Sequence, residues 1–151
     1  MISLSFSYKS EKIRMKKDLN VLLIEDNLIE VMKMKRTISF LELEHILAVA
    51  NNGEEALAAL EDKSKIPDLI LLDLNMPKVS GIEFLTILKN NDSIKHIPTV
   101  ILTTSDNQKD LEECYRLGVS GYVLKPLKYD DYVEKIKNVL SYWSMNELKN
   151  Y

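Results

Sequence analysis

The chain has 151 residues, of which 46% are hydrophobic and 28% are charged, and its formal net charge is -3 at pH 7. This length allows one domain with a proper hydrophobic core and is too short for two. The net charge is too small, and the charges are too mixed in sign, to predict a nucleic-acid-binding surface. The sequence has no run of about 18 apolar residues, so no membrane span is predicted.

Residues 1–18 are rich in serine and lysine and show no sustained hydrophobic period. We expect a disordered or loosely attached tail, and Met15 could equally be the natural start of the chain. The segment lacks the apolar block of a signal peptide. The single cysteine, Cys114, is expected to be a buried thiol, and the absence of a disulfide framework fits a cytoplasmic protein.

From there, five short apolar runs alternate with five amphipathic segments. The apolar runs predict strands at 21–24, 46–50, 69–72, 100–102 and 121–124. The segments between and after them predict helices at 28–41, from 52 onward, and at 81–88, 109–117 and 130–147. Strands that are apolar throughout are typical of a parallel sheet with helices on both faces, so the sequence predicts a doubly wound α/β fold. We expect one domain over residues 19–145, followed by a C-terminal tail at 146–151.

Polar residues follow four of the five runs. They are Glu25 and Asp26 after the first run, Asp73 after the third, Thr103 and Thr104 after the fourth, and Lys125 and Pro126 after the fifth. Because right-handed crossovers bring the carboxyl ends of parallel strands to one edge of the sheet, these side chains are expected to meet there.

Three carboxylates crowded at one edge repel each other unless a cation compensates, and Mg²⁺ suits oxygen ligands. Lys125 adds a further positive charge. A metal ion and an ammonium group can neutralise the oxygens of a phosphoryl group in transfer, and an aspartate can act as its nucleophile. The pattern therefore predicts a Mg²⁺-assisted phosphoryl acceptor site.

From residue 19 to about residue 140 the chain resembles the receiver domain of two-component response regulators, such as the chemotaxis regulator. The matching motifs are Glu25-Asp26, Asp73-Leu74-Asn75-Met76-Pro77, Gly81, Thr103 and Gly121-Tyr122-Val123-Leu124-Lys125-Pro126. The resemblance implies a flavodoxin-like, five-stranded parallel sheet of strand order 2-1-3-4-5 with five helices.

The same resemblance implies a role for each residue of the site. Asp73 would be phosphorylated, and Mg²⁺ would be bound by Asp26, Asp73 and the backbone carbonyl of Asn75, with Glu25 acting through a water molecule. Thr103 and Lys125 would each contact a phosphoryl oxygen. The bond between Lys125 and Pro126 would be cis, which would aim the lysine at the phosphate.

A conformational switch is also implied. Thr103 would move toward the phosphoryl group, and Tyr122 would swing into the space that it leaves. The surface of the fourth helix, fifth strand and fifth helix would then change, as a shift between two states. Asn75, Thr104 and Ser105 would tune the lifetime of the acyl phosphate or access to it.

The partners implied are a sensor histidine kinase or a phosphotransfer protein, and a downstream protein target that the sequence does not identify. A weaker similarity points to the small regulators paired with bacterial phytochrome kinases. The protein would be a stand-alone response regulator that is a phosphoacceptor, with self-catalysed phosphorylation and dephosphorylation only, and not a turnover enzyme.

Two other functions are less favoured. A pseudo-receiver would dock partners without taking up phosphate, but every acceptor residue is present. An aspartate-dependent phosphatase would need a second acid at the position of Asn75. His45 and His96 have no metal-ligand partner at a suitable spacing.

The last helix carries an unusually wide apolar stripe. Tyr132, Ile136, Val139, Leu140 and Trp143 fit its inner face, and Tyr129, Val133 and Tyr142 widen the stripe. This pattern indicates either deeper packing into the core or a homodimer formed through the last strand and helix.

Overall fold

The computed structural model describes residues 17–148, so most of the predicted N-terminal tail and part of the C-terminal tail lie outside the described residues. The strands are β1 (Asn20–Ile24), β2 (Ile46–Ala50), β3 (Leu69–Leu72), β4 (Thr99–Thr103) and β5 (Gly121–Leu124). The α-helices are α2 (Leu28–Phe40), α3 (Gly53–Ala59), α4 (Gly81–Lys89), α5 (Gln108–Arg116) and α6 (Tyr129–Ser144), and a short 3₁₀ helix, η1, covers Lys63–Lys65.

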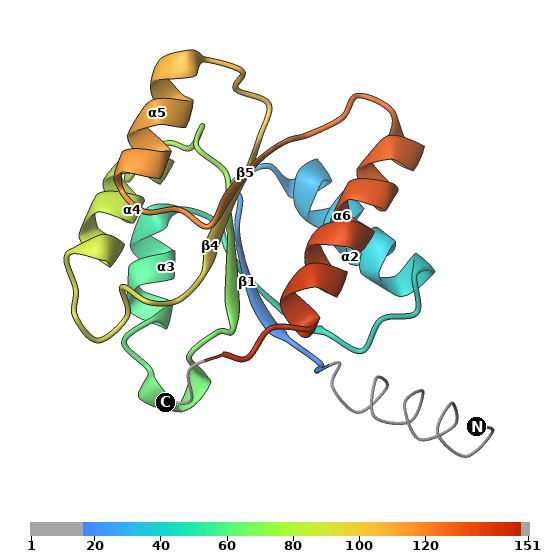
Figure 1. Ribbon diagram of the computed structural model, residues 1–151, viewed down its shortest axis with the longest axis horizontal. Coiled ribbons are helices and arrows are strands. Elements are labelled where there is room, and N and C mark those ends of the chain that lie inside the picture. Colours follow the sequence, from blue (N-terminus) through green and yellow to red (C-terminus); the bar gives the residue numbers. More distant parts are fainter. Residues whose placement is uncertain (1–16, 149–151) are drawn as a thin grey trace, which may run out of the picture.

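The five strands form one parallel sheet in the order β2-β1-β3-β4-β5, which confirms the predicted fold and strand order. Helices α3, α4 and α5 cover one face of the sheet, and α2 and α6 cover the other (Figure 1). None of the helices in residues 17–148 is long and apolar enough to cross a membrane.

Side-chain caps determine where most of the helices begin. The Asn52 side chain accepts a hydrogen bond of 2.8 Å from the backbone of Glu55, which confirms the predicted cap of α3. Asn27, Ser80 and Asn107 cap α2, α4 and α5 in the same way. The last helix is shorter than predicted and ends at Ser144, because the backbone beyond it turns back onto Tyr142 and Trp143.

The sheet separates two hydrophobic cores. The core under α3, α4 and α5 includes the fully buried Phe84, Leu85 and Leu88, and also Cys114, as predicted. Burial raises the pKa of the Cys114 thiol to about 11, which keeps it protonated and unreactive.

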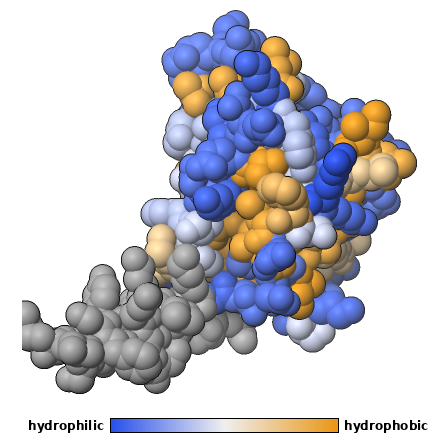
Figure 2. Space-filling model, turned by 90° about the vertical axis from the view of Figure 1, so that its right-hand side faces the viewer, coloured by the Kyte–Doolittle hydropathy of each residue, from blue (hydrophilic) through white to orange (hydrophobic). Residues whose placement is uncertain are grey.

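The core under α2 and α6 takes in Tyr132, Ile136 and Leu140. The predicted inner face of α6 is therefore buried, whereas Tyr142, one of the residues that widen the apolar stripe, is 57% exposed. The outer side of the molecule, where α2 and α6 lie, is partly apolar. Figure 2 shows hydrophobic side chains, in orange, gathered in the middle of this side among hydrophilic ones.

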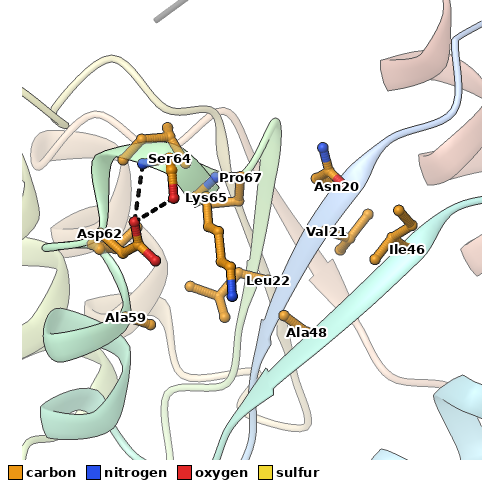
Figure 3. A pocket seen from close by; sticks show the side chains of 12 residues that line it. Asn20, Val21, Leu22, Ile46, Ala48, Ala59, Asp62, Ser64, Lys65 and Pro67 are labelled. Atoms are coloured by element: carbon orange, nitrogen blue, oxygen red, sulfur yellow. Dashed lines mark hydrogen bonds between the residues drawn. The ribbon is translucent and has the colours of Figure 1, made fainter.

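A cavity of about 620 Å³ lies at the amino ends of β1 and β2, beside the end of α3 (Figure 3). Its walls are largely apolar, and the one carboxylate in it, Asp62, accepts hydrogen bonds from the backbone and hydroxyl of Ser64. The cavity is therefore at the end of the sheet opposite to the predicted site.

Candidate functional site

The predicted site residues are held together by the backbone of the sheet itself. The Asp73 N–H donates to the Ile24 carbonyl over 3.1 Å, which places Asp73 beside Glu25. The Lys125 N–H donates to the Thr103 carbonyl over 2.8 Å on the other side. Because these bonds continue the strand pairing by one residue, side chains distant in sequence meet at one edge.

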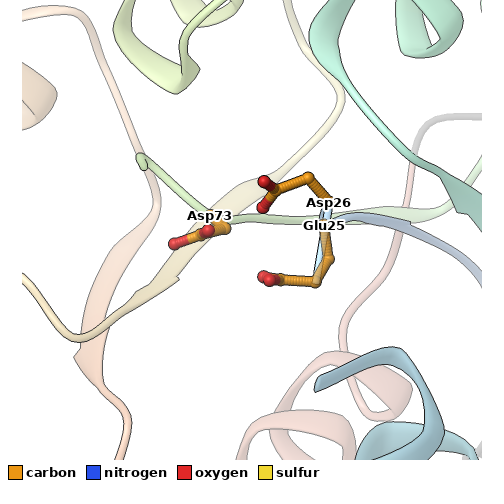
Figure 4. A group of neighbouring side chains, drawn as sticks. All are labelled: Glu25, Asp26 and Asp73. Carbon is orange, nitrogen blue, oxygen red and sulfur yellow. The ribbon is translucent and has the colours of Figure 1, made fainter. Parts of the chain in front are cut away.

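Glu25, Asp26 and Asp73 form a cluster of three carboxylates at this edge. One carboxylate oxygen from each lies within 4.8 Å of the others. Figure 4 shows the three side chains turned toward the same side of the strand ends. Glu25 and Asp73 are buried, whereas Asp26 is exposed, so the cluster is open to solvent on one side.

Burial makes this cluster electrostatically unfavourable without a cation. Burial raises the pKa of Glu25 to about 7, against the opposing charge of Lys125. Burial also raises the pKa of Asp73, although the charge of Lys125 and a hydrogen bond from the Asn75 backbone oppose the rise. Three hard oxygen donors, two of which are buried carboxylates that resist ionisation, fit a divalent cation, whose charge would favour the ionised forms of Glu25 and Asp73.

Lys125 reaches the site with a side chain that is 7% exposed. Its Nζ atom lies 3.1 Å from Glu25 Oε2 and 3.6 Å from Glu30 Oε2. The expectation of a cis bond between Lys125 and Pro126 is wrong for this structure, since residues 17–148 contain no cis peptide bond. The lysine reaches the carboxylates with a trans bond because β5 ends directly beside Thr103.

Thr103 and Tyr122 lie together on the other side of the site. Thr103 is fully buried, and its hydroxyl accepts the N–H of Ser105. The Tyr122 hydroxyl donates to the Ser105 carbonyl over 2.8 Å, and its ring packs against the α3–α5 core. The two predicted switch residues therefore hold the same residue of the loop after β4.

The hydroxyl of Ser105 also donates to Asp110 at the start of α5, over 2.6 Å. The loop that follows β4 is thus tied both to β5 and to α5. A movement of this loop would be passed directly to the face formed by α5, β5 and α6.

Most of the predicted site residues, but neither Thr103 nor Tyr122, line a shallow cavity of about 270 Å³ together with Glu30 of α2 and the cap residue Asn27. The lining consists of Glu25, Asp26, Asn27, Glu30, Asp73, Asn75, Thr104 and Lys125. The two histidines remain apart from the site, and His45 Nδ1 accepts the backbone N–H of Leu19.

The model of the response regulator receiver domain matches residues 21–137 of this chain. The chain belongs to the response regulator receiver family. It is 34% identical over 128 residues to the response regulator Rcp1 of Synechocystis, a match that covers 82% of this chain and 87% of that protein.

Solved receiver structures give the same result. The phosphorylated cyanobacterial phytochrome response regulator RcpA superposes with a TM-score of 0.82 and 31% identity, covering 89% of this chain and all of that one. The Mn²⁺-bound form of Rcp1 superposes with a TM-score of 0.79 and 32% identity, covering 87% of this chain and 99% of that one. The similarity of this receiver to phytochrome response regulators is thereby confirmed.

Sequence reasoning missed Glu30, which lies against Lys125 although 95 positions separate them. In the sequence it is one more acid in the first turn of an amphipathic helix, where acidic residues commonly favour the helix dipole. Its position in the first turn of a helix that begins two residues after Asp26 was the signal that could have indicated an approach to the site.

Proposed function

We propose that this receiver accepts a phosphoryl group on Asp73 from a histidine kinase or a phosphotransfer protein. The observation that carries the proposal is the meeting of three carboxylates with Lys125 at the carboxyl edge of the sheet. Membership of the receiver family supports the proposal, and so does the phosphorylated state of the similar regulator RcpA.

In the proposed step, a carboxylate oxygen of Asp73 forms a bond to phosphorus while the bond from phosphorus to the donor imidazole nitrogen breaks. The electron pair of the broken bond returns to that nitrogen. A donor ring protonated at its second nitrogen leaves as neutral imidazole, and Asp73 becomes an acyl phosphate. Lys125 would pair with one phosphoryl oxygen, and the Thr103 hydroxyl would donate to another.

Asp26, Asp73 and the backbone carbonyl of Asn75 would hold Mg²⁺, with Glu25 acting through a water molecule. When bound, the ion would neutralise charge on the phosphoryl oxygens during transfer. The Mn²⁺ in the similar Rcp1 structure supports a divalent cation here, and the oxygen donors of this site favour Mg²⁺ as the physiological one.

The signal would leave through the face formed by α5, β5 and α6. In this proposal the Thr103 hydroxyl turns to the phosphoryl group and releases the Ser105 N–H that it now accepts. The loop after β4 then moves, and Tyr122 changes position with it. Phosphorylation favours one of two states of this face, which a downstream protein recognises.

Exposed apolar side chains flank the site and would contact the phosphate donor. Leu28, Ile29 and Met32 on α2 are 70%, 72% and 60% exposed, and Leu127, two residues after Lys125, is fully exposed. The similarity to phytochrome response regulators favours a phytochrome-type histidine kinase as the donor.

The test is phosphorylation by a small donor. Incubation with Mg²⁺ and acetyl phosphate is expected to add one labile phosphoryl group, seen as a gain in intact mass, and Asp73→Asn is expected to abolish it. Asp68→Asn, which removes an acid at the opposite end of the sheet, is the matched control and should be labelled like the parent. An unlabelled parent protein would favour the pseudo-receiver instead, and continued hydrolysis of varied phosphate esters would favour a phosphatase.

A further inference from the structure

Glu30 is a fourth carboxylate at the site and comes from α2, outside the strand-end motifs. Its Oε1 atom lies 3.4 Å from Lys33 Nζ, and its Oε2 atom lies 3.6 Å from Lys125 Nζ. The Oε2 atom is buried and has no hydrogen-bond partner among the described residues. The ammonium of Lys125 is therefore the cation that compensates this buried oxygen.

Lys125 is shared between the carboxylates of Glu25 and Glu30. Within residues 17–148, its ion pairs shorter than 4.0 Å are those with these two residues. The charge of Asp73 also strongly attracts Lys125, although the two side chains form no ion pair within 4.0 Å. A phosphoryl group on Asp73 would therefore have to draw the ammonium away from its present partners.

We infer that Glu30 is a positioning residue that holds Lys125 toward α2 and competes with the phosphoryl group for its ammonium. This inference rests on the proposed function. Moving the ammonium away would leave the buried Oε2 atom of Glu30 without its cation, so the pull of Glu30 opposes the phosphorylated state. The strength of that pull sets how readily the receiver switches.

The competition between Glu30 and the phosphoryl group for Lys125 would also affect residues outside the site. When Lys125 leaves, Lys33 remains as the cation next to Glu30, and Lys33 lies over the ring of Tyr132 at 4.3 Å from its centre. Tyr132 is a buried residue of α6. Glu30 therefore links the charge at Asp73 to the packing of α2 against α6.

Beryllofluoride, a mimic of the phosphoryl group, gives the direct test in the presence of Mg²⁺. Glu30→Gln keeps the shape of the side chain and removes its charge, so we expect it to bind beryllofluoride about two- to fivefold more tightly than the parent, the range for a partly exposed ion pair. Glu54→Gln is the matched control, because Glu54 is an exposed acid in the first turn of α3. It should bind like the parent.

A double-mutant cycle separates an action through Lys125 from a general effect of charge. In a Lys125→Met background, Glu30→Gln should leave the affinity for beryllofluoride unchanged. An equal gain in that background would overturn the inference, and so would an unchanged or weaker affinity of Glu30→Gln alone.

A second measurement needs no beryllofluoride. It tests the inference if the Lys125→Met variant binds beryllofluoride too weakly for its affinity to be measured. The ¹⁵N NMR signal of the Lys125 ammonium should shift in Glu30→Gln and stay in place in Glu54→Gln, and an unshifted signal in Glu30→Gln would contradict the inference. If the parent protein itself fails to bind beryllofluoride, the proposed function falls. A parent that binds alongside an unaffected Glu30→Gln removes only the role of Glu30.

Discussion

Glu25 and Asp73 are carboxylates that the fold removes from water and sets beside a third, Asp26. Burial favours their protonated forms, and a bound cation would favour their ionised forms, so protons and metal compete for the same oxygens. The same burial weakens the folded protein when no metal is present. Since the folded pKa of Glu25 is about 7 and its ordinary value is 4.5, metal-free stability should fall as the pH rises between these values.

Mg²⁺ affinity is accordingly expected to rise several-fold between pH 6 and pH 8, as Glu25 loses its proton near pH 7. Calorimetric titration at both values, in buffers of different ionisation enthalpy, measures the affinity and the protons released. Glu25→Gln should bind more weakly and show a flatter pH profile. An affinity that does not change with pH in the parent would contradict this account of the site.

At the scale of elements, α4 begins very close to the loop that carries Asp73. The Gly81 N–H donates to the Leu74 carbonyl. A Cβ atom at Gly81 would lie 2.6 Å from the Asp73 carbonyl oxygen and 2.6 Å from Leu74 Cα, both of them backbone atoms. The absence of a side chain at Gly81 thus lets α4 begin in direct contact with the backbone that carries Asp73.

Gly81→Ala is expected to lower the free energy of unfolding by about 1–3 kcal/mol, because the backbone has to move to admit the methyl group. Urea unfolding measures this, and Mg²⁺ binding should weaken with it because Asp73 shifts. Gly121→Ala is the control, since a Cβ atom there would lie 3.7 Å from Val100 in ordinary contact. Equal stabilities for the two variants would show that the contact at Gly81 is relaxed without cost.

The elements follow from the sequence because the central strands β1, β3 and β4 are buried almost throughout and therefore read as continuous apolar runs. The edge strands β2 and β5 are less buried, but their sequences are apolar as well. The meeting of Glu25, Asp26 and Asp73 could also be predicted, because parallel strands end at one edge of the sheet. The approach of Glu30 to Lys125 and the hydrogen bond from Tyr122 to Ser105 could not be predicted from the sequence. Both depend on how a helix or loop packs against the sheet, which hydrophobic periodicity does not specify.

For the whole molecule, β5 is one of the two edge strands of the sheet and is only half-buried, with Leu124 40% exposed. A shallow groove of about 420 Å³ runs between β5 and α6, and Val123 and Val139 contribute to its walls. An apolar edge of this kind favours pairing with a second copy of the chain. The homodimer predicted through the last strand and helix therefore remains our proposal.

Leu124→Lys is expected to weaken such a dimer by at least about tenfold, because it places a charge at the centre of the contact. Sedimentation over a range of protein concentrations measures the dissociation constant. Ile87→Lys alters an equally exposed apolar residue on α4, 46% exposed, and should leave the association unchanged. A parent protein that sediments as a monomer at every concentration would rule out this interface.

The separation of the two cores by the sheet has a spectroscopic consequence. Trp143 is the single tryptophan of the chain and packs against the core under α2 and α6, whereas Tyr122 packs against the other. Tryptophan fluorescence therefore reports on one layer only and does not directly sense the rearrangement expected at Tyr122. A change in tryptophan emission upon phosphorylation would be an optical signature that the response has reached the layer of α2 and α6, by way of Glu30, Lys33 and Tyr132.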